Sequence, residues 1–156
     1  MCIRDRNKGL DNQSVDIALA WIEAYEGQAI ALPGVEEVLK ALKAENIKIG
    51  LATNDVERNG RLHMEQLGLA SYFDAFVGSD SGFGGKPDPS MIIGCAKRMN
   101  LEPSDCVMVG DTDRDTLAGE AAGCKATVLV LNGQSEKNTE NIKSDYRFEQ
   151  TRCLKI

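Results

Sequence analysis

The chain has 156 residues, of which 42% are hydrophobic and 27% charged, and its formal net charge is −6 at pH 7. These values are typical of one soluble globular domain with a core of its own. No basic stripe is visible, which argues against nucleic acid as the main partner. No apolar run approaches the ~20 residues that cross a bilayer, so no membrane partner is expected either.

The N-terminal part of the chain gives two separate expectations. The opening string MCIRDR shows no periodicity, so we expect residues 1–6 to be an artefact or a disordered terminus. Apolar residues then recur at helical spacing and predict a helix over 14–26. Pro33 and Gly34 break the chain after this helix, which could therefore belong to a different structural unit from the rest.

Strands and helices alternate in the remainder of the chain. The predicted helices cover 35–42, 56–67, 90–99 and 113–122, and the predicted strands cover 47–52, 73–77, 106–109 and 126–131. Asp55 is a candidate cap for the second of these helices, and the run at 106–109 has the length of a fully buried strand. This alternation predicts a doubly wound α/β fold with a parallel sheet. The polar segment after 131 has no clear pattern.

Two carboxylates follow one predicted strand closely. Asp111 and Asp115 lie in the string VMVGDTDRD, where Gly110 turns the chain at the end of the apolar run. Open α/β sheets bind ligands at this edge, and paired carboxylates without nearby Cys or His suit Mg²⁺. The alternative is a helix N-cap, which would explain one of the two aspartates.

Two further polar groups are predicted at the same edge of the sheet. Thr53 and Asn54 follow the strand IKIGLA, where a hydroxyl and free helix N–H groups can hold a phosphate oxygen, although Thr53 could equally be a cap. Lys86 lies in a loop made of glycines and prolines, GGKPDP. A lysine held in such a loop can offset the charge of a transferring phosphoryl group.

Other kinds of site are disfavoured. The loop around Lys86 lacks the Ser or Thr that a P-loop needs after its lysine, and no G-x-S-x-G string is present. His63 is the only histidine and falls inside a predicted helix, which predicts an exposed or partly packed residue. The five cysteines (Cys2, Cys95, Cys106, Cys124 and Cys153) form no C-x-x-C pair. Free thiols of this kind indicate a reducing compartment, and we expect a cytoplasmic protein.

The order LATN, GKPDP and VGDTDRD resembles the haloacid dehalogenase superfamily, in particular its phosphoglycolate-phosphatase-like branch, over about residues 14–135. The resemblance implies a Rossmann-like core in which Thr53 and Asn54 correspond to motif II and Lys86 to motif III. It implies that Asp111 is a magnesium ligand and that Asp115 supports the metal through water. It also implies that residues 7–31 are the remnant of a helical cap and that 32–156 form the core.

One departure from that family concerns its motif I, an apolar strand that ends in D-x-D-G-(T/S). The family uses the first Asp of this motif as nucleophile and the second as acid/base, and the strand is central in the sheet. This sequence contains no such string, and Asp5 has too few residues before it to end a buried strand. We therefore expect an incomplete core without its central first strand, and a chain truncated from an active parent.

The resulting hypothesis is a magnesium-dependent phosphatase of a small phosphorylated metabolite, acting through an aspartyl-phosphate. The chain as given is expected to be inactive because the nucleophile is absent. Three alternatives remain: a non-catalytic protein or binding domain of the same fold, a dehalogenase or phosphonate hydrolase of the same family, and a signalling receiver domain. The receiver places its acidic residues before its Thr and Lys, whereas here Thr53 and Lys86 precede Asp111.

Overall fold

The computed structural model describes residues 30–131 and 141–149. In chain order its elements are α2 (Val35–Ala44), β1 (Gly50–Ala52), α3 (Glu57–Gln66), β2 (Ala75–Val77), α4 (Ser90–Arg98), β3 (Val107–Gly110), α5 (Asp113–Ala122), β4 (Ala126–Val130) and β5 (Tyr146–Phe148), with short 3-10 turns at Ala70–Tyr72 and Pro103–Asp105. The predicted alternation is confirmed. Residues 1–6, the helix predicted at 14–26 and nearly all of the proposed cap segment 7–31 lie outside the described residues. None of the described helices is long and apolar enough to span a membrane.

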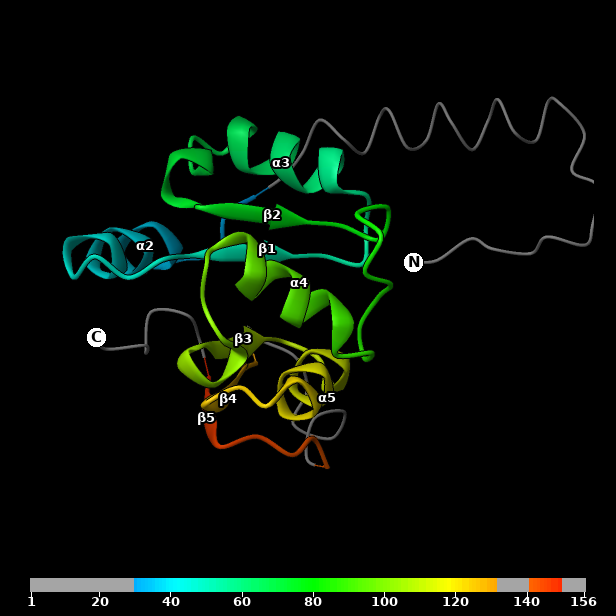
Figure 1. Cartoon of the computed structure of the whole chain (residues 1–156). Coiled ribbons are helices and arrows are strands. Elements are labelled where there is room, and N and C mark those ends of the chain that lie inside the picture. The colour runs from blue at the N-terminus through cyan, green and yellow to red at the C-terminus, as the bar shows by residue number, and fades with distance from the viewer. Residues whose placement is uncertain (1–29, 132–140, 150–156) are drawn as a thin grey trace, which may run out of the picture.

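All five described strands are paired in parallel, but they form two separate groups (Figure 1). One group is β1–β2 and the other is β3–β4–β5. Within the described part of the chain, β1 pairs only with β2 and β3 pairs only with β4, so each has one open edge. The expected parallel α/β fold is therefore confirmed, and the described residues form a partial core in which no strand joins the two groups.

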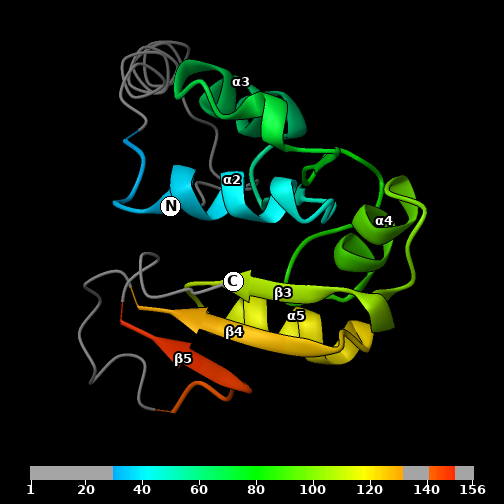
Figure 2. The ribbon, with the colours of Figure 1, turned by 90° about the vertical axis from the view of Figure 1, so that its left-hand side faces the viewer.

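Helix α4 connects the two groups of strands, because it packs against β1, β2 and α5. Its buried side chains form a core with the adjacent strand, made of Ala75, Val77, Met91, Cys95 and Met99. A second buried region surrounds β4, where the residues from 128 to 131 are at most 7% exposed. Figure 2 shows α5 lying behind β3 and β4, the two strands against which it packs.

Strand β3 differs from the expectation of full burial. Val107 and Val109 are 50% and 49% exposed, although both belong to the apolar run. Met108, which points to the other face, lies against Gly119 of α5. The strand is thus covered by α5 on one face and open on the other, within the residues described. An apolar run alone does not show whether both faces of a strand will be covered. Among the described strands, β3 lies at the edge of its group.

Candidate active site

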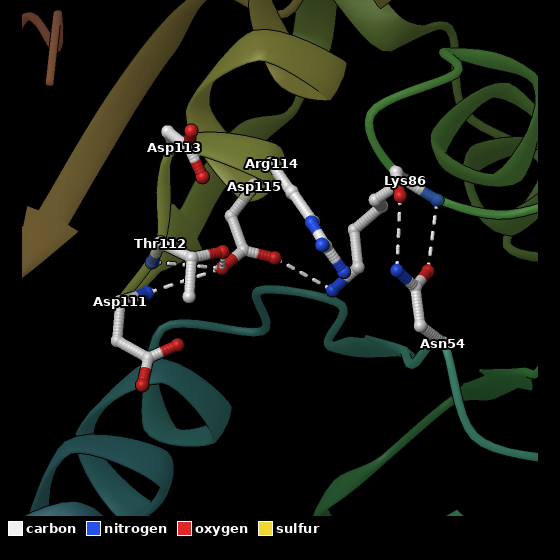
Figure 3. Close-up of a pocket in the computed structure, with 7 residues that line it drawn as sticks. All are labelled: Asn54, Lys86, Asp111, Thr112, Asp113, Arg114 and Asp115. Carbon is white, nitrogen blue, oxygen red and sulfur yellow. Dashed lines mark hydrogen bonds and ion pairs between the residues drawn. The ribbon is translucent and has the colours of Figure 1, made fainter. Parts of the chain in front are cut away.

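A pocket of about 460 Å³ lies where β1 and β3 end, at the carboxyl edge of the strands. Its lining comes from three segments: Asn54 after β1, Lys86 from the glycine-rich loop, and residues 111–115 from the turn into α5 (Figure 3). Ligands of open α/β sheets bind at this edge. The structure therefore brings together Asn54, Lys86, Asp111 and Asp115, as the sequence predicted.

The turn from β3 into α5 is built around the carboxylate of Asp115. Thr112 is the N-cap of α5, and Asp115 forms a capping box with it by accepting from the Thr112 backbone N–H at 3.1 Å and hydroxyl at 2.7 Å. The Asp111 backbone N–H donates to the same oxygen at 3.2 Å. Gly110 allows this approach, since a Cβ there would lie 2.2 Å from Cβ of Asp115. The N-cap of α5 is therefore Thr112 and neither of the two aspartates, and Asp115 takes part in the cap as the third helical residue of the capping box.

The second oxygen of Asp115 forms an ion pair with Lys86. Lys86 Nζ lies 2.6 Å from Asp115 Oδ1, and the two side chains are only 12% and 8% exposed. Burial by itself would raise the pKa of Asp115, but the hydrogen bond and charge of Lys86, helped by Thr112, lower it below its usual range. Asp115 is therefore a carboxylate whose two oxygens are both engaged.

Lys86 connects the two groups of strands at the pocket. Its ammonium also donates to the backbone carbonyl of Ala52, the last residue of β1, at 2.7 Å. Two of the three ammonium protons of Lys86 therefore have identified acceptors. One acceptor is the Ala52 carbonyl at the end of β1, and the other is the Asp115 carboxylate in the first turn of α5. The main chain of Lys86 is held by the Asn54 side chain through two hydrogen bonds of 2.8 and 2.9 Å.

Thr53 lies beside the pocket rather than among the residues that line it. Its backbone N–H donates to the carbonyl of Val77 at 2.9 Å and so continues the ladder between β1 and β2. Its hydroxyl oxygen accepts from the backbone N–H of Asp55 at 3.1 Å. This leaves the hydroxyl proton of Thr53 able to donate to an acceptor near the end of β1.

A complete magnesium site is not formed by the residues that the structure describes. No three of their Cys, His, Asp or Glu side chains come together as metal ligands. Figure 3 shows the carboxylate of Asp111 directed away from that of Asp115. Asp111 offers the hard carboxylate oxygen that Mg²⁺ prefers. Asp115 accepts from Lys86 and from Thr112.

Three residues that line the pocket, Thr112, Asp113 and Arg114, were not identified from the sequence. Thr112 closes the capping box, and the spacing T-x-x-D in residues 112–115 is the signal that could have found it. Arg114, in the first turn of α5, is an exposed cation that lines the pocket, and no short sequence pattern marks it. His63 lies in α3, partly buried and outside the pocket lining, as expected.

Comparison with known families agrees with this geometry. Residues 3–123 match the family of haloacid dehalogenase-like hydrolases. The chain belongs to the haloacid dehalogenase-like hydrolase family. Its three motif segments meet at one pocket, as the family resemblance implied from their order in the sequence.

Among curated members of the family, the chain is similar to phosphoglycolate phosphatases. It is 34% identical over 126 residues to phosphoglycolate phosphatase 1 of Pseudomonas aeruginosa, covering 78% of this chain and 46% of that protein. It is 34% identical over 108 residues to phosphoglycolate phosphatase of Aquifex aeolicus, covering 69% of this chain and 50% of that protein. The chain thus spans about half the length of these curated relatives.

Solved structures of other proteins agree with this one in fold. A β-phosphoglucomutase from Clostridium difficile superposes with a TM-score of 0.73 at 26% identity, covering 94% of this chain and 65% of that one. A hydrolase from Pseudomonas syringae gives a TM-score of 0.74 at 27% identity, covering 93% and 68%.

Proposed function

We propose that this chain is part of a magnesium-dependent phosphatase that hydrolyses a small phosphomonoester similar to phosphoglycolate. The observation that carries this proposal is the position of the Lys86 ammonium, which bridges the end of β1 and the start of α5 at the two open strand edges. By resemblance to the family, the strand of motif I would lie between those edges and would end beside Lys86. The similar phosphoglycolate phosphatases support the substrate class.

In this proposal Lys86, which lines the pocket, and Thr53, which lies beside it, have separate roles. Lys86 offsets the negative charge that develops on a transferring phosphoryl group, which is an electrostatic contribution fixed in advance of the reaction. Thr53 donates its hydroxyl proton to a phosphate oxygen at the end of β1. Positioning and electrostatics of this kind carry most of the catalysis of phosphoryl transfer.

Asp111 is the residue that would bind Mg²⁺. When bound, the metal would neutralise charge on the phosphoryl oxygens. No three such ligands come together among the described residues, so the proposal takes the remaining protein ligands from motif I. Asp115 is better placed to fix Lys86 and the 111–112 turn than to reach the same metal directly.

The 156-residue chain itself is proposed to lack phosphatase activity, because its sequence holds no D-x-D-G-(T/S) string. Free thiols at Cys95, Cys106 and Cys124 support a reducing, cytoplasmic location for the protein. A non-catalytic binding role on the same fold is the alternative function that the missing motif favours.

A fusion experiment tests the proposed function. The segment of the Pseudomonas aeruginosa relative that precedes its matched region would be joined to this chain, and phosphate release from 2-phosphoglycolate would be measured with Mg²⁺ and with a chelator. We expect metal-dependent turnover from the fusion, none from the 156-residue chain, and none from a fusion whose first motif I Asp is replaced by Asn. A folded fusion that releases no phosphate would favour the binding role, and release of halide from a haloacid would favour a dehalogenase.

A further inference from the structure

The loop from Gly78 to Lys86 holds the nearly buried ammonium group of Lys86 in place, although its many glycines favour a mobile loop. Gly82 and Gly84 adopt positive φ angles of 85° and 79°, and Gly85 follows directly. Glycine loses more conformational freedom on ordering than any other residue. A lysine at the end of such a loop keeps one position only if other parts of the chain hold the loop.

The far end of the loop is held by Asn54. Its Nδ2 donates to the carbonyl of Lys86 at 2.9 Å, and its Oδ1 accepts from the backbone N–H of Lys86 at 2.8 Å. The side-chain amide thus pairs with the main chain of Lys86 in both directions, as one strand pairs with another. This geometry gives Asn54 a different role from the phosphate binding that its place in the sequence suggested.

The near end of the loop is held by Glu57, three residues further along the same segment. Ser81 donates its hydroxyl proton to Glu57 Oε2 at 2.6 Å and accepts from the backbone N–H of Gly78 at 2.9 Å. The backbone N–H of Glu57 donates in turn to Oδ1 of Asp80 at 2.7 Å. Gly78 permits this contact, because a Cβ there would lie 2.0 Å from the backbone nitrogen of Glu57.

Glu57 is itself anchored to the core through Arg98. The guanidinium of Arg98, at the end of α4, donates to Glu57 Oε2 at 2.6 Å and also to the carbonyl of Phe76 in β2. It lies over the ring of Phe83, with 5.7 Å between the guanidinium carbon and the ring centroid. The near end of the loop is therefore tied to α3, α4 and β2 together.

We propose that Asn54 and Glu57 are positioning residues that clamp the loop at its two ends and thereby set the Lys86 ammonium against Ala52 and Asp115. The functional consequence rests on the proposed function, in which Lys86 meets a phosphoryl group. The structural consequence does not: losing either end of the clamp releases the Lys86 side chain while the core around α4 stays folded.

The test uses the 156-residue chain with ¹³C-labelled lysine, and follows the Hε–Cε NMR signals. Lys86→Arg assigns the Lys86 signal. Lys48, whose ammonium donates to the carbonyl of Met99 at 2.7 Å, is a held lysine outside the loop and serves as internal reference. In Asn54→Ala and in Glu57→Gln, we expect the Lys86 signal to move towards those of exposed lysines and the Lys48 signal to stay.

Matched controls separate the clamp from a general loss of stability. Asn59→Ala removes hydrogen bonds of 3.3 Å to Asp55, which lies outside the loop, so it should leave the Lys86 signal in place. Ser81→Ala and Asn54→Asp are milder replacements for any variant that fails to fold. Asn54→Asp keeps the acceptor for the Lys86 N–H but loses the donor, and should give a smaller shift than Asn54→Ala.

The outcomes are distinct. The proposal is overturned if the Lys86 signal stays in place in both Asn54→Ala and Glu57→Gln. It is also overturned if the Lys86 and Lys48 signals move equally. If the Lys86 signal moves in only one of these variants, the residue replaced in the other variant is not part of the clamp. Addition of inorganic phosphate and Mg²⁺ to the fusion that carries motif I then tests the proposed function separately. If phosphate leaves the Lys86 signal unchanged, the phosphoryl role of Lys86 fails, whereas the comparison of variants still decides whether the clamp exists.

Discussion

Val109 and Val128 are register partners in the adjacent parallel strands β3 and β4, yet Val109 is 49% exposed and Val128 only 7%. Partners in a parallel ladder point to the same face of the sheet. Burial of that face therefore ends between two neighbouring strands, at the strand whose other edge has no partner in the described residues. Open apolar edges of this kind favour association between copies of a chain.

This difference in burial predicts that the same substitution will destabilise the protein at Val128 much more than at Val109. Val128→Thr should lower the free energy of unfolding by about 1–3 kcal/mol, because it buries a hydroxyl. Val109→Thr should change it by less than about 0.5 kcal/mol, and should reduce self-association. Urea unfolding and light scattering measure the two effects. Equal destabilisation by both substitutions would show that the β3 face is covered in solution.

The chain as a whole should be only marginally stable. A central strand contributes several buried side chains at about 1.5–3 kcal/mol each, against a total stability of about 5–15 kcal/mol for an ordinary domain. We expect a broad or irreversible thermal transition with aggregation, followed by circular dichroism and light scattering. A sharp, reversible and cooperative melt of the monomer would contradict this expectation.

Asp113 and Asp115 offer a matched pair of substitutions in the first turn of α5. Asp115→Asn removes the charged partner of Lys86 and weakens the capping box, so a loss of about 1.5–3 kcal/mol in unfolding free energy is expected. Asp113 is exposed, and Asp113→Asn should cost only the helix-dipole contribution of about 0.3–1 kcal/mol. Urea unfolding of the two variants gives the comparison. Similar losses would mean that the ion pair with Lys86 adds little.

Glu57 predicts a pH-dependent part of the stability. Hydrogen bonds from Ser81 and Arg98 lower the pKa of Glu57 below its ordinary value of 4.5. Its contribution is therefore present above about pH 4.5 and is lost as the pH falls through the lower, folded-state pKa. Wild type and Glu57→Gln should differ more in urea midpoint at pH 7 than at pH 3. A difference that is independent of pH would exclude this carboxylate as the cause.

Catalytic predictions apply to the fusion that carries motif I. Asp111→Ala should remove Mg²⁺ binding and activity together, which calorimetry and phosphate release would show. Lys86→Ala should leave metal affinity nearly unchanged but lower kcat by about 10²–10³, the usual effect of losing one preorganised electrostatic contact. His63→Ala is the control and should have little effect. If it were as damaging as Lys86→Ala, the pocket would not be the active site.

Local patterns in the sequence predicted most of the elements and the edge at which the site lies. Apolar runs and helical spacing depend on near neighbours, so the helices α2 to α5 and the order of the first four strands agree with the structure. Thr53, Lys86 and Asp111 could also be placed near this edge from local sequence, because each follows a predicted strand or lies in a loop rich in glycine. β5 was missed, because Tyr146–Phe148 is short and has no clear strand pattern of its own. It is identified as a strand by its pairing with β4.

Contacts between distant residues were decided only by the tertiary structure. Asp55 was the predicted cap of α3, but the N-cap is Val56, and the first helical N–H donates instead to Asp80, 23 residues further along the chain. The pairing of Asp115 with Lys86 joins residues 29 apart. Such pairs form because the fold brings the loop and the strand ends together. The spacing of residues along the chain does not predict which distant segments will be in contact. Which face of β3 stays open is decided in the same way, since burial depends on the elements that pack against a strand.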